Sequence, residues 1–303
     1  MKVYILGSGA AVPTANRGVS SVAVQIDRDW LLIDCGEGTQ VQMQRFSVRW
    51  GKINHILISH LHGDHYFGLP GLIFTYHLYN RKKPLNIYSP PGLKSIIGQL
   101  LQTSLPNLSY PIVFHEFQPE RPYGILSTKY FDVTTFPLVH RVTSNGFLIR
   151  TSEGDRKIKP EFIADYQPDR HLLRGIQLGN DYPDGNGDLI SNATITLKGR
   201  RSVSFAYVSD TSFAPEIAEH ILSVDLLYHE ATFPDGEAAL AKSKGHCTSG
   251  QAAAIAHLAG AGQLVMGHLS PRIKSLDDFL NQAIAVFPNT TLAADGQVYE
   301  IKP

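Results

Sequence analysis

Short apolar segments recur along most of the chain, and Gly, Asp or His follows many of them directly. Their length and their content of Val, Ile, Leu, Phe and Tyr are typical of strands that are buried on one or both faces. The strands predicted in this way lie at residues 2–6, 22–26, 30–34, 56–58, 86–89, 112–117, 129–136, 145–150, 203–208, 225–228, 264–267, 291–294 and 297–301.

Segments with the apolar spacing of amphipathic helices alternate with these strands. Thr248 has the hydroxyl of an N-cap, and the run of small residues after it predicts a helix. The repeated order of strand, turn and helix predicts an α/β protein in which helices pack on sheets. The predicted helices lie at residues 39–45, 68–79, 93–105, 214–221, 248–257 and 277–285.

The stretch from residue 151 to about residue 200 interrupts this pattern. It combines mixed charge with several prolines and only a weak helical run at residues 160–166. We interpret it as an arm, at about 151–200, inserted into a single domain that spans residues 1–303. Because its basic residues alternate with acidic ones, we favour a solvated surface over an RNA contact surface for this stretch.

The composition is that of a folded protein without membrane spans. Of 303 residues, 43% are hydrophobic and 18% are charged, which is enough apolar material for a sizeable core. No apolar stretch is long enough to cross a bilayer, and the first residues do not form a signal peptide, so we expect a cytoplasmic location. The 27 basic and 27 acidic residues balance, and net charge therefore neither supports nor excludes a nucleic-acid partner.

The densest candidate chemistry lies at residues 59–65, which read Ser-His-Leu-His-Gly-Asp-His after a short apolar strand. Imidazole and carboxylate without thiolate suit zinc, and also manganese or iron. His60 and His62 point the same way in an extended segment, whereas Asp64 and His65 follow the bend at Gly63. The segment can therefore provide ligands to two metal ions. A solvated His-rich loop is the alternative, and four such residues in this spacing argue against it.

Further ligand-type residues follow other apolar segments far along the chain. His268 comes directly after a predicted strand, and Asp210 and His140 follow within two and four residues of the end of one. Seven ligands suit two divalent ions that share one carboxylate, and Asp34 could orient a ligand histidine from behind. The candidate metal ligands are His60, His62, Asp64, His65, His140, Asp210 and His268.

This order of residues resembles the metallo-β-lactamase superfamily, and its finer motifs resemble the ribonuclease Z family. The resemblance implies a four-layer α/β fold, in which two mixed β-sheets pack face to face with helices on both outer faces. It also implies two metal ions, with zinc as the first expectation and Mn²⁺ or Fe²⁺ as alternatives. The matching segments lie at residues 7–9, 34–40, 60–71, 229–233, 246–248 and 268–272.

By the same resemblance, each ligand has an expected place. His60, His62 and His140 would hold one metal. Asp64, His65 and His268 would hold the other, with Asp210 bridging the two ions.

The ribonuclease Z family removes the 3′ trailer from precursor tRNA, so the resemblance implies a phosphodiesterase in which metal-activated water attacks the phosphodiester. His246 is the expected proton donor for the leaving oxygen, and Glu230 is expected to orient its imidazole. Asp64 is also expected to take the proton of the attacking water. Ser270 and Arg272 are expected to hold a substrate phosphate, unless Glu230 and Arg272 serve as structural ion-pair residues instead. The partners implied are precursor tRNA and a second copy of the chain, as a homodimer.

The predicted arm departs from the family pattern and leaves other functions open. Residues 167–179 lack the Gly-Pro motif of the family arm and are less basic. A smaller substrate is therefore the alternative: a cyclic nucleotide or other phosphodiester, a sulfate ester or a lactone. A redox enzyme with two metals fits less well, because it would prefer a carboxylate at His62. A non-catalytic RNA-binding module leaves the complete ligand set without a use.

Overall fold

The computed structural model describes residues 1–185 and 187–303, and the chain divides into two compact units. The first unit consists of residues Met1–Arg150 and Ser204–Lys302, and the second is Thr151–Val203. Asn186, which belongs to the predicted arm, lies outside the described residues. Within the described part of the chain, no helix combines the length and the apolar character that a membrane span requires.

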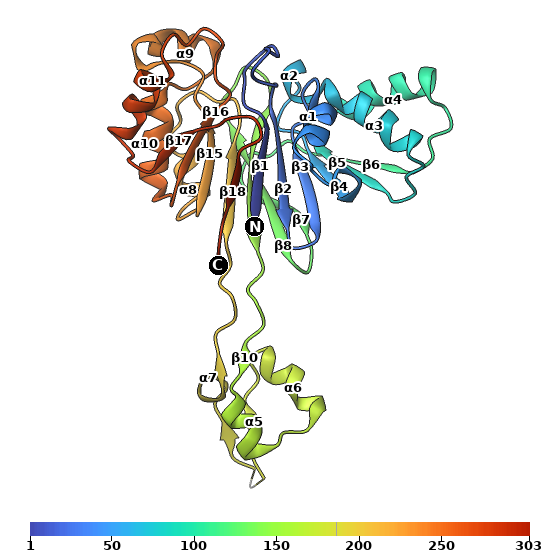
Figure 1. Cartoon of the computed structure of the whole chain (residues 1–303), viewed down its shortest axis with the longest axis vertical. Coiled ribbons are helices and arrows are strands. Elements are labelled where there is room, and N and C mark those ends of the chain that lie inside the picture. Colours follow the sequence, from blue (N-terminus) through green and yellow to red (C-terminus); the bar gives the residue numbers. More distant parts are fainter. Residues whose placement is uncertain (186) are drawn as a thin grey trace. The chain divides into compact units, whose positions relative to one another are not determined.

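Two mixed seven-stranded sheets form the centre of the first unit (Figure 1). The first sheet has the strand order β18-β1-β2-β3-β4-β5-β6, and β3 to β6 run parallel to one another. The strands of this sheet are β1 (Lys2–Gly7), β2 (Ser21–Ile26), β3 (Asp29–Ile33), β4 (Ile53–Leu57), β5 (Leu85–Ser89), β6 (Ile112–Glu116) and β18 (Val298–Glu300).

The second sheet has the order β17-β16-β15-β14-β9-β8-β7, and its strands β14 to β17 are parallel. The strands of this sheet are β7 (Tyr123–Ser127), β8 (Phe131–Leu138), β9 (Ser144–Thr151), β14 (Ser204–Val208), β15 (Leu226–Glu230), β16 (Leu264–Gly267) and β17 (Thr290–Leu292).

Helices lie on the outer sides of the two sheets. Figure 1 shows α1, α3 and α4 beside the first sheet and α8, α10 and α11 beside the second. The arrangement confirms the predicted fold of two mixed sheets with helices outside. The helices of this unit are α1 (Thr39–Arg45), the short turn η1 (Trp50–Lys52), α2 (Gly63–Tyr66), α3 (Gly68–Leu78), α4 (Leu93–Ser104), α8 (Ile217–His220), the short turn η2 (Asp235–Glu237), α9 (Ala238–Lys244), α10 (Ser249–Ala259) and α11 (Leu276–Ile284).

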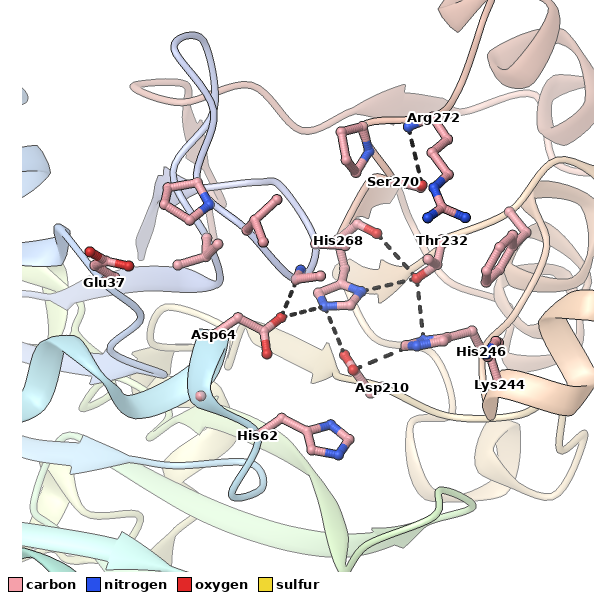
Figure 2. A pocket seen from close by; sticks show the side chains of 18 of the residues that line it. Glu37, His62, Asp64, Asp210, Thr232, Lys244, His246, His268, Ser270 and Arg272 are labelled. Atoms are coloured by element: carbon pink, nitrogen blue, oxygen red, sulfur yellow. Dashed lines mark hydrogen bonds and ion pairs between the residues drawn. The ribbon is translucent and has the colours of Figure 1, made fainter.

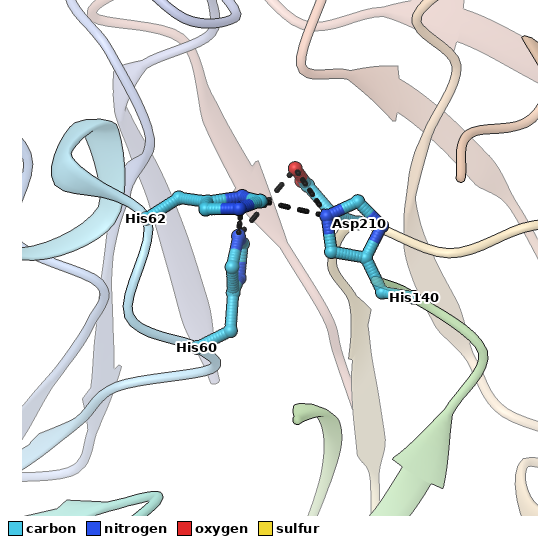
Figure 3. A group of neighbouring side chains, drawn as sticks. All are labelled: His60, His62, His140 and Asp210. Atoms are coloured by element: carbon cyan, nitrogen blue, oxygen red, sulfur yellow. Dashed lines mark hydrogen bonds and ion pairs between the residues drawn. The ribbon is translucent and has the colours of Figure 1, made fainter. Parts of the chain in front are cut away.

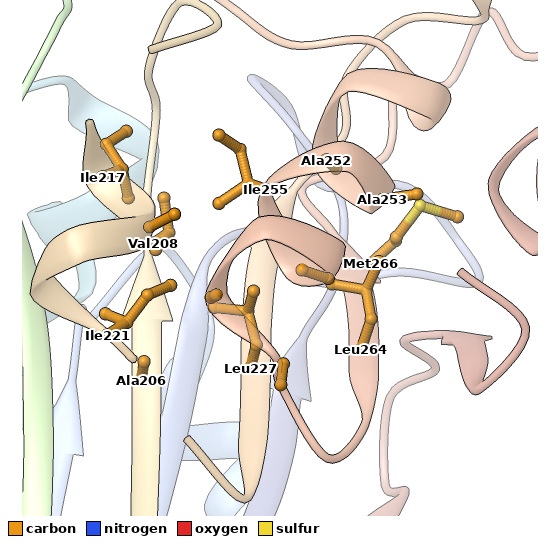
Figure 4. Close-up of a cluster of buried hydrophobic side chains, with 14 of the residues drawn as sticks. Ala206, Val208, Ile217, Ile221, Leu227, Ala252, Ala253, Ile255, Leu264 and Met266 are labelled. Atoms are coloured by element: carbon orange, nitrogen blue, oxygen red, sulfur yellow. The ribbon is translucent and has the colours of Figure 1, made fainter. Parts of the chain in front are cut away.

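A separate apolar core joins each sheet to its helices. In β3, Leu32 packs toward the helices, while its neighbours Leu31 and Ile33 are buried on the opposite face, as the alternation of a strand requires. The second core packs side chains of β14, β15 and β16 against α8 and the alanines of α10 (Figure 4). Small side chains let α10 lie close to the sheet, and a capping box of Thr248 and Gln251 fixes its first turn.

The parallel strands determine where the candidate chemistry lies. Their carboxyl ends meet at one edge of each sheet, and ligands of open α/β sheets bind at such edges. His60 and its neighbours follow β4, Asp210 follows β14, and His268 follows β16 directly. β15 runs through Glu230, so His229 and Glu230 belong to the strand and do not follow it as expected.

The second unit has more structure than its sequence predicts. Besides the expected α5 it contains two further helices and two small ladders, and Phe162, Ile176 and Ile195 form its core. Leu172, Leu173 and Ile176 of α6 have helical spacing, but the helix has only eight residues and includes Gly175, which weakens the helical signal in the sequence. The elements of this unit are β10 (Lys157–Ile158), α5 (Pro160–Tyr166), α6 (Arg170–Gln177), β11 (Tyr182–Pro183), β12 (Leu189–Ile190), α7 (Asn192–Ile195) and β13 (Thr196–Leu197).

The metal-type motif is held by a close crossing of two backbone segments. Cys35 N donates to His65 O at 2.7 Å, and Gly68 N donates to Cys35 O at 2.9 Å. A Cβ on Gly68 would overlap the carbonyl oxygen of Gly36. A side chain on Gly36 would likewise collide with the backbone of Asp64. Both glycines are therefore required for the chain after β3 to lie against the motif.

We predict that Gly68→Ala lowers stability by about 1–3 kcal/mol, because the added methyl must displace backbone. A fall in the urea midpoint, together with weaker metal binding, would show this. Gly98→Ala is the matched control. Gly98 also lies in a helix, but its Cβ would meet no atom within 4 Å, so this variant should keep or slightly raise stability. Equal stability of the two variants would contradict the account of the crossing.

Candidate metal centre and active site

The residues expected as metal ligands converge at one place in the first unit. Two groups of them have ligand-type atoms that all lie within 4.8 Å of one another. Figure 3 shows the first group, with three imidazoles and a carboxylate arranged around a common centre. The first group is His60, His62, His140 and Asp210, and the second is Asp64, His65 and His268.

A hydrogen-bonding partner orients most of these imidazoles from behind. His140 Nδ1 donates to Gly245 O at 2.7 Å, and His65 Nδ1 lies 2.8 Å from Asp34 Oδ2. Ser59 Oγ is 3.1 Å from His60 Nδ1. In each case the Nε2 atom is left for the centre. A partner at one ring nitrogen fixes the tautomer and leaves the other nitrogen as a ligand, as is usual for metal-binding histidines.

The inward-facing nitrogens of the first group are close enough to bind one cation together. His62 Nδ1 is 3.0 Å from His60 Nε2 and 3.4 Å from His140 Nε2. Burial lowers the pKa of all three imidazoles, which favours the neutral form that binds metals. Neutral rings whose lone pairs face each other repel. A divalent ion that accepts all three would remove the repulsion.

Asp210 lies between the two groups. Its Oδ2 is 3.6 Å from His60 Nε2, and its Oδ1 is 3.5 Å from His65 Nε2 and 3.3 Å from His268 Nε2. The Oδ1 atom is buried and has no hydrogen-bond partner in the described part of the chain. An unpaired buried carboxylate oxygen is costly. The donor set and this oxygen therefore fit divalent metal ions.

Asp34 supports the second group from inside the protein. Besides His65, its carboxylate accepts hydrogen bonds from Ser59 N at 2.8 Å, Ser59 Oγ at 2.9 Å and Tyr207 Oη at 2.9 Å. Its backbone is left-handed, with φ of 56°, a conformation that aspartate tolerates better than most residues. Tyr207 belongs to the second sheet, so this carboxylate also ties the two sheets together.

Glu230 and His246 meet beside the cluster, as the sequence predicted. His246 Nδ1 lies 3.2 Å from Glu230 Oε1, and Cys247 N donates to the same oxygen at 2.8 Å. Burial lowers the pKa of His246, but the charge and hydrogen bond of Glu230 outweigh it, and the pKa is raised overall. His246 also shares a possible metal-binding group with Asp210 and His268, so the geometry permits two roles.

Thr232 is a residue at the centre of the site that the sequence analysis did not single out. Its hydroxyl donates to Glu230 Oε2 at 2.8 Å and lies 2.9 Å from His268 Nδ1 and 3.3 Å from His246 Nδ1. With its one proton on Glu230, the oxygen accepts from His268 Nδ1 and leaves Nε2 for a metal. The motif at residues 229–233 contained the threonine, but its contacts with His246 and His268 join segments 14 and 36 residues away in sequence.

A pocket of about 760 Å³ opens over the cluster (Figure 2). Asp64, Asp210, His246 and His268 lie on its floor, and Ser270 and Arg272 belong to its wall. Arg272 N donates to Ser270 Oγ at 3.2 Å. The ion pair between Glu230 and Arg272 considered from the sequence is not formed, because the partner of Glu230 is His246.

The chain is similar to known proteins over nearly its whole length. A family model described as "Anti-Pycsar protein Apyc1" matches residues 1–180. Ribonuclease Z of Bacteroides fragilis is 41% identical over 294 residues, which cover 97% of each chain. The short form of human tRNase Z is 29% identical with a TM-score of 0.74, and the match covers both chains fully.

A further solved structure bears on the fold alone. The metallo-β-lactamase fold protein YhfI of Bacillus subtilis superposes with a TM-score of 0.70 at 22% identity, over 98% of each chain. The chain therefore belongs to the ribonuclease Z family, a family with the metallo-β-lactamase fold, and its residues 1–180 also match the Apyc1 family.

Proposed function

We propose that this protein is a metal-dependent endoribonuclease that removes the 3′ trailer from precursor tRNA. The observation that supports this best is the combination of two convergent ligand groups with the Glu230–His246 pair at one pocket. Two cations can neutralise the negative charge that the two non-bridging oxygens of a phosphodiester share. A proton donor assists the departure of its poor leaving group. The family membership makes precursor tRNA the expected substrate.

We propose the same division of ligands as the sequence suggested. His60, His62 and His140 would hold one divalent ion, and Asp64, His65 and His268 would hold the other, with Asp210 between the two groups. When bound, such ions neutralise the phosphate and lower the pKa of a coordinated water. Zinc suits this set of imidazole and carboxylate donors, and manganese or iron remain alternatives.

The residues around the ions then act on the proton and the substrate. His246, oriented by Glu230, donates a proton to the leaving oxygen. Asp64 remains a proposed acceptor for the proton of the attacking water, although its Oδ2 already accepts from Ala11 N at 2.9 Å and lies 3.3 Å from His268 Nε2. Ser270 and Arg272 are proposed to contact a substrate phosphate from the pocket wall.

We also propose three further properties of the chain. These are the inserted arm on a single domain, the homodimer and the cytoplasmic location. The arm gives some support to a smaller phosphodiester as the substrate. Its basic residues are partly used within the second unit, since Arg174 pairs with Asp155 and Lys159 donates to Thr194 O at 2.6 Å. Fewer cations are then free for RNA.

The substrate is tested by offering metal-loaded protein a 3′-extended precursor tRNA and the small ester bis-p-nitrophenyl phosphate. We predict cleavage of the precursor at the trailer, loss of activity on chelation, and recovery when Zn²⁺ is restored. Hydrolysis of the small ester or of a cyclic nucleotide, with no cleavage of the precursor, would show that the tRNA assignment is wrong and the smaller substrate correct.

The role of His246 is tested by His246→Ala. Loss of a general acid should lower turnover on precursor tRNA by about 100- to 10,000-fold. The loss on bis-p-nitrophenyl phosphate should be much smaller, because p-nitrophenolate leaves without protonation. Metal content, measured by elemental analysis, should not change. His257→Ala, on the exposed side of α10, is the control and should behave as wild type. If His246→Ala loses a metal ion, His246 is a ligand instead.

A further inference from the structure

Two cationic side chains form part of the pocket wall that the reaction described above does not use. Arg141 follows the expected ligand His140, and Lys244 is the last residue of α9. Both line the pocket over the cluster, together with His246. We call this pair the Arg141–Lys244 wall. In Figure 2, Lys244 lies next to His246, on the side of the pocket away from Glu37.

A hydrogen bond from a side chain to the backbone brings the segments of these two residues together. The hydrogen bond from His140 Nδ1 to Gly245 O holds the segment that carries Arg141 against the segment that carries Lys244. Gly245 is left-handed, with φ of 79°, and a Cβ there would lie 2.7 Å from His140 Nδ1 and 3.7 Å from Arg141 Cγ. The side chain of Arg141 therefore runs past Gly245, and the wall is built by the same contact that orients a ligand.

The wall has no acidic partner. Neither Arg141 nor Lys244 makes an ion pair or side-chain hydrogen bond among the described residues. The acids that line the pocket are Glu37, Asp64 and Asp210. The last two face the histidines of the cluster. With divalent ions bound beside it, this side of the pocket carries an excess of positive charge that an anion must balance.

The pocket also has exposed apolar side chains in its lining. Val12 and Phe67 line it and are 54% and 61% exposed. Exposed aromatic side chains such as Phe67 are surfaces on which unpaired bases stack, while cations follow the phosphates of a single strand. An exposed aromatic side chain and two cations in one pocket suit a polynucleotide better than an isolated phosphate.

We propose that Arg141 and Lys244 bind a second phosphate of the RNA strand, next to the phosphate that is cleaved. The proposal rests on the proposed function and deepens it, because the Arg141–Lys244 wall would separate a polynucleotide from a single phosphodiester. A substrate with one phosphate occupies the metal centre and leaves the wall empty. A strand with successive phosphates occupies both.

The test uses the full-length, metal-loaded variants Arg141→Gln and Lys244→Gln. Each should lower kcat/KM on precursor tRNA by about 10-fold and make its salt dependence shallower by about one unit of slope. Hydrolysis of bis-p-nitrophenyl phosphate and the metal content should stay unchanged. Lys242→Gln is the matched control. It removes the same charge from the last turn of α9, where a lysine also suits the helix dipole, but Lys242 does not line the pocket.

Binding of a single-stranded oligoribonucleotide, followed by fluorescence anisotropy, separates this proposal from the function itself. If wild-type protein fails to cleave precursor tRNA, the proposed function is wrong, but the wall is still tested by the affinity for the oligonucleotide. Weaker binding by both variants and wild-type binding by Lys242→Gln would support the wall. Unchanged binding and cleavage, or equal losses on RNA and on the small ester, would overturn it.

Discussion

The buried carboxylate of Asp34 is the interaction on which the arrangement of the site most depends. It accepts hydrogen bonds from the backbone and side chain of Ser59 and from Tyr207, and it orients His65. Ser59 opens the metal-type motif after the first sheet, and Tyr207 comes from the second. A charge buried at this depth must be fully hydrogen-bonded, and each of its partners is therefore fixed in place. The two sheet edges are held in register by this requirement.

Hydrogen bonds also fix the other imidazoles of the centre. Each of several imidazoles receives a partner at Nδ1, and each partner comes from a different part of the chain: Asp34, Ser59, Gly245 and Thr232. The free nitrogens are thereby directed to one place before any ion arrives. His268 reaches it in a left-handed conformation, with φ of 54°. Strain of this kind is tolerated where the surrounding contacts determine the position.

Much of this could be predicted from the sequence, because the ligands follow strands that are clearly apolar. His60, His140 and His268 could be placed at sheet edges for that reason, and α1, α3 and α10 were predicted nearly in full. The supporting residues could not be predicted. Thr232, Ser59 and Tyr207 are ordinary polar residues whose importance comes from long-range contacts. In the second unit, α6 is short and contains Gly175, which weakens its helical signal, and β7 has little burial to give it a pattern.

The site combines ligand-type histidines and aspartates with a Glu–His pair in a chain of the ribonuclease Z family. Asp210 lies between two groups of ligand-type residues, and the Glu230–His246 pair lies beside them at one pocket. Anomalous diffraction from crystals of the zinc-loaded protein, collected on both sides of the zinc edge, tests the central claim most directly. The account predicts two peaks, one at His60, His62 and His140 and one at Asp64, His65 and His268, each in contact with Asp210. A single peak, or a peak held by His246, in an otherwise intact fold would contradict it.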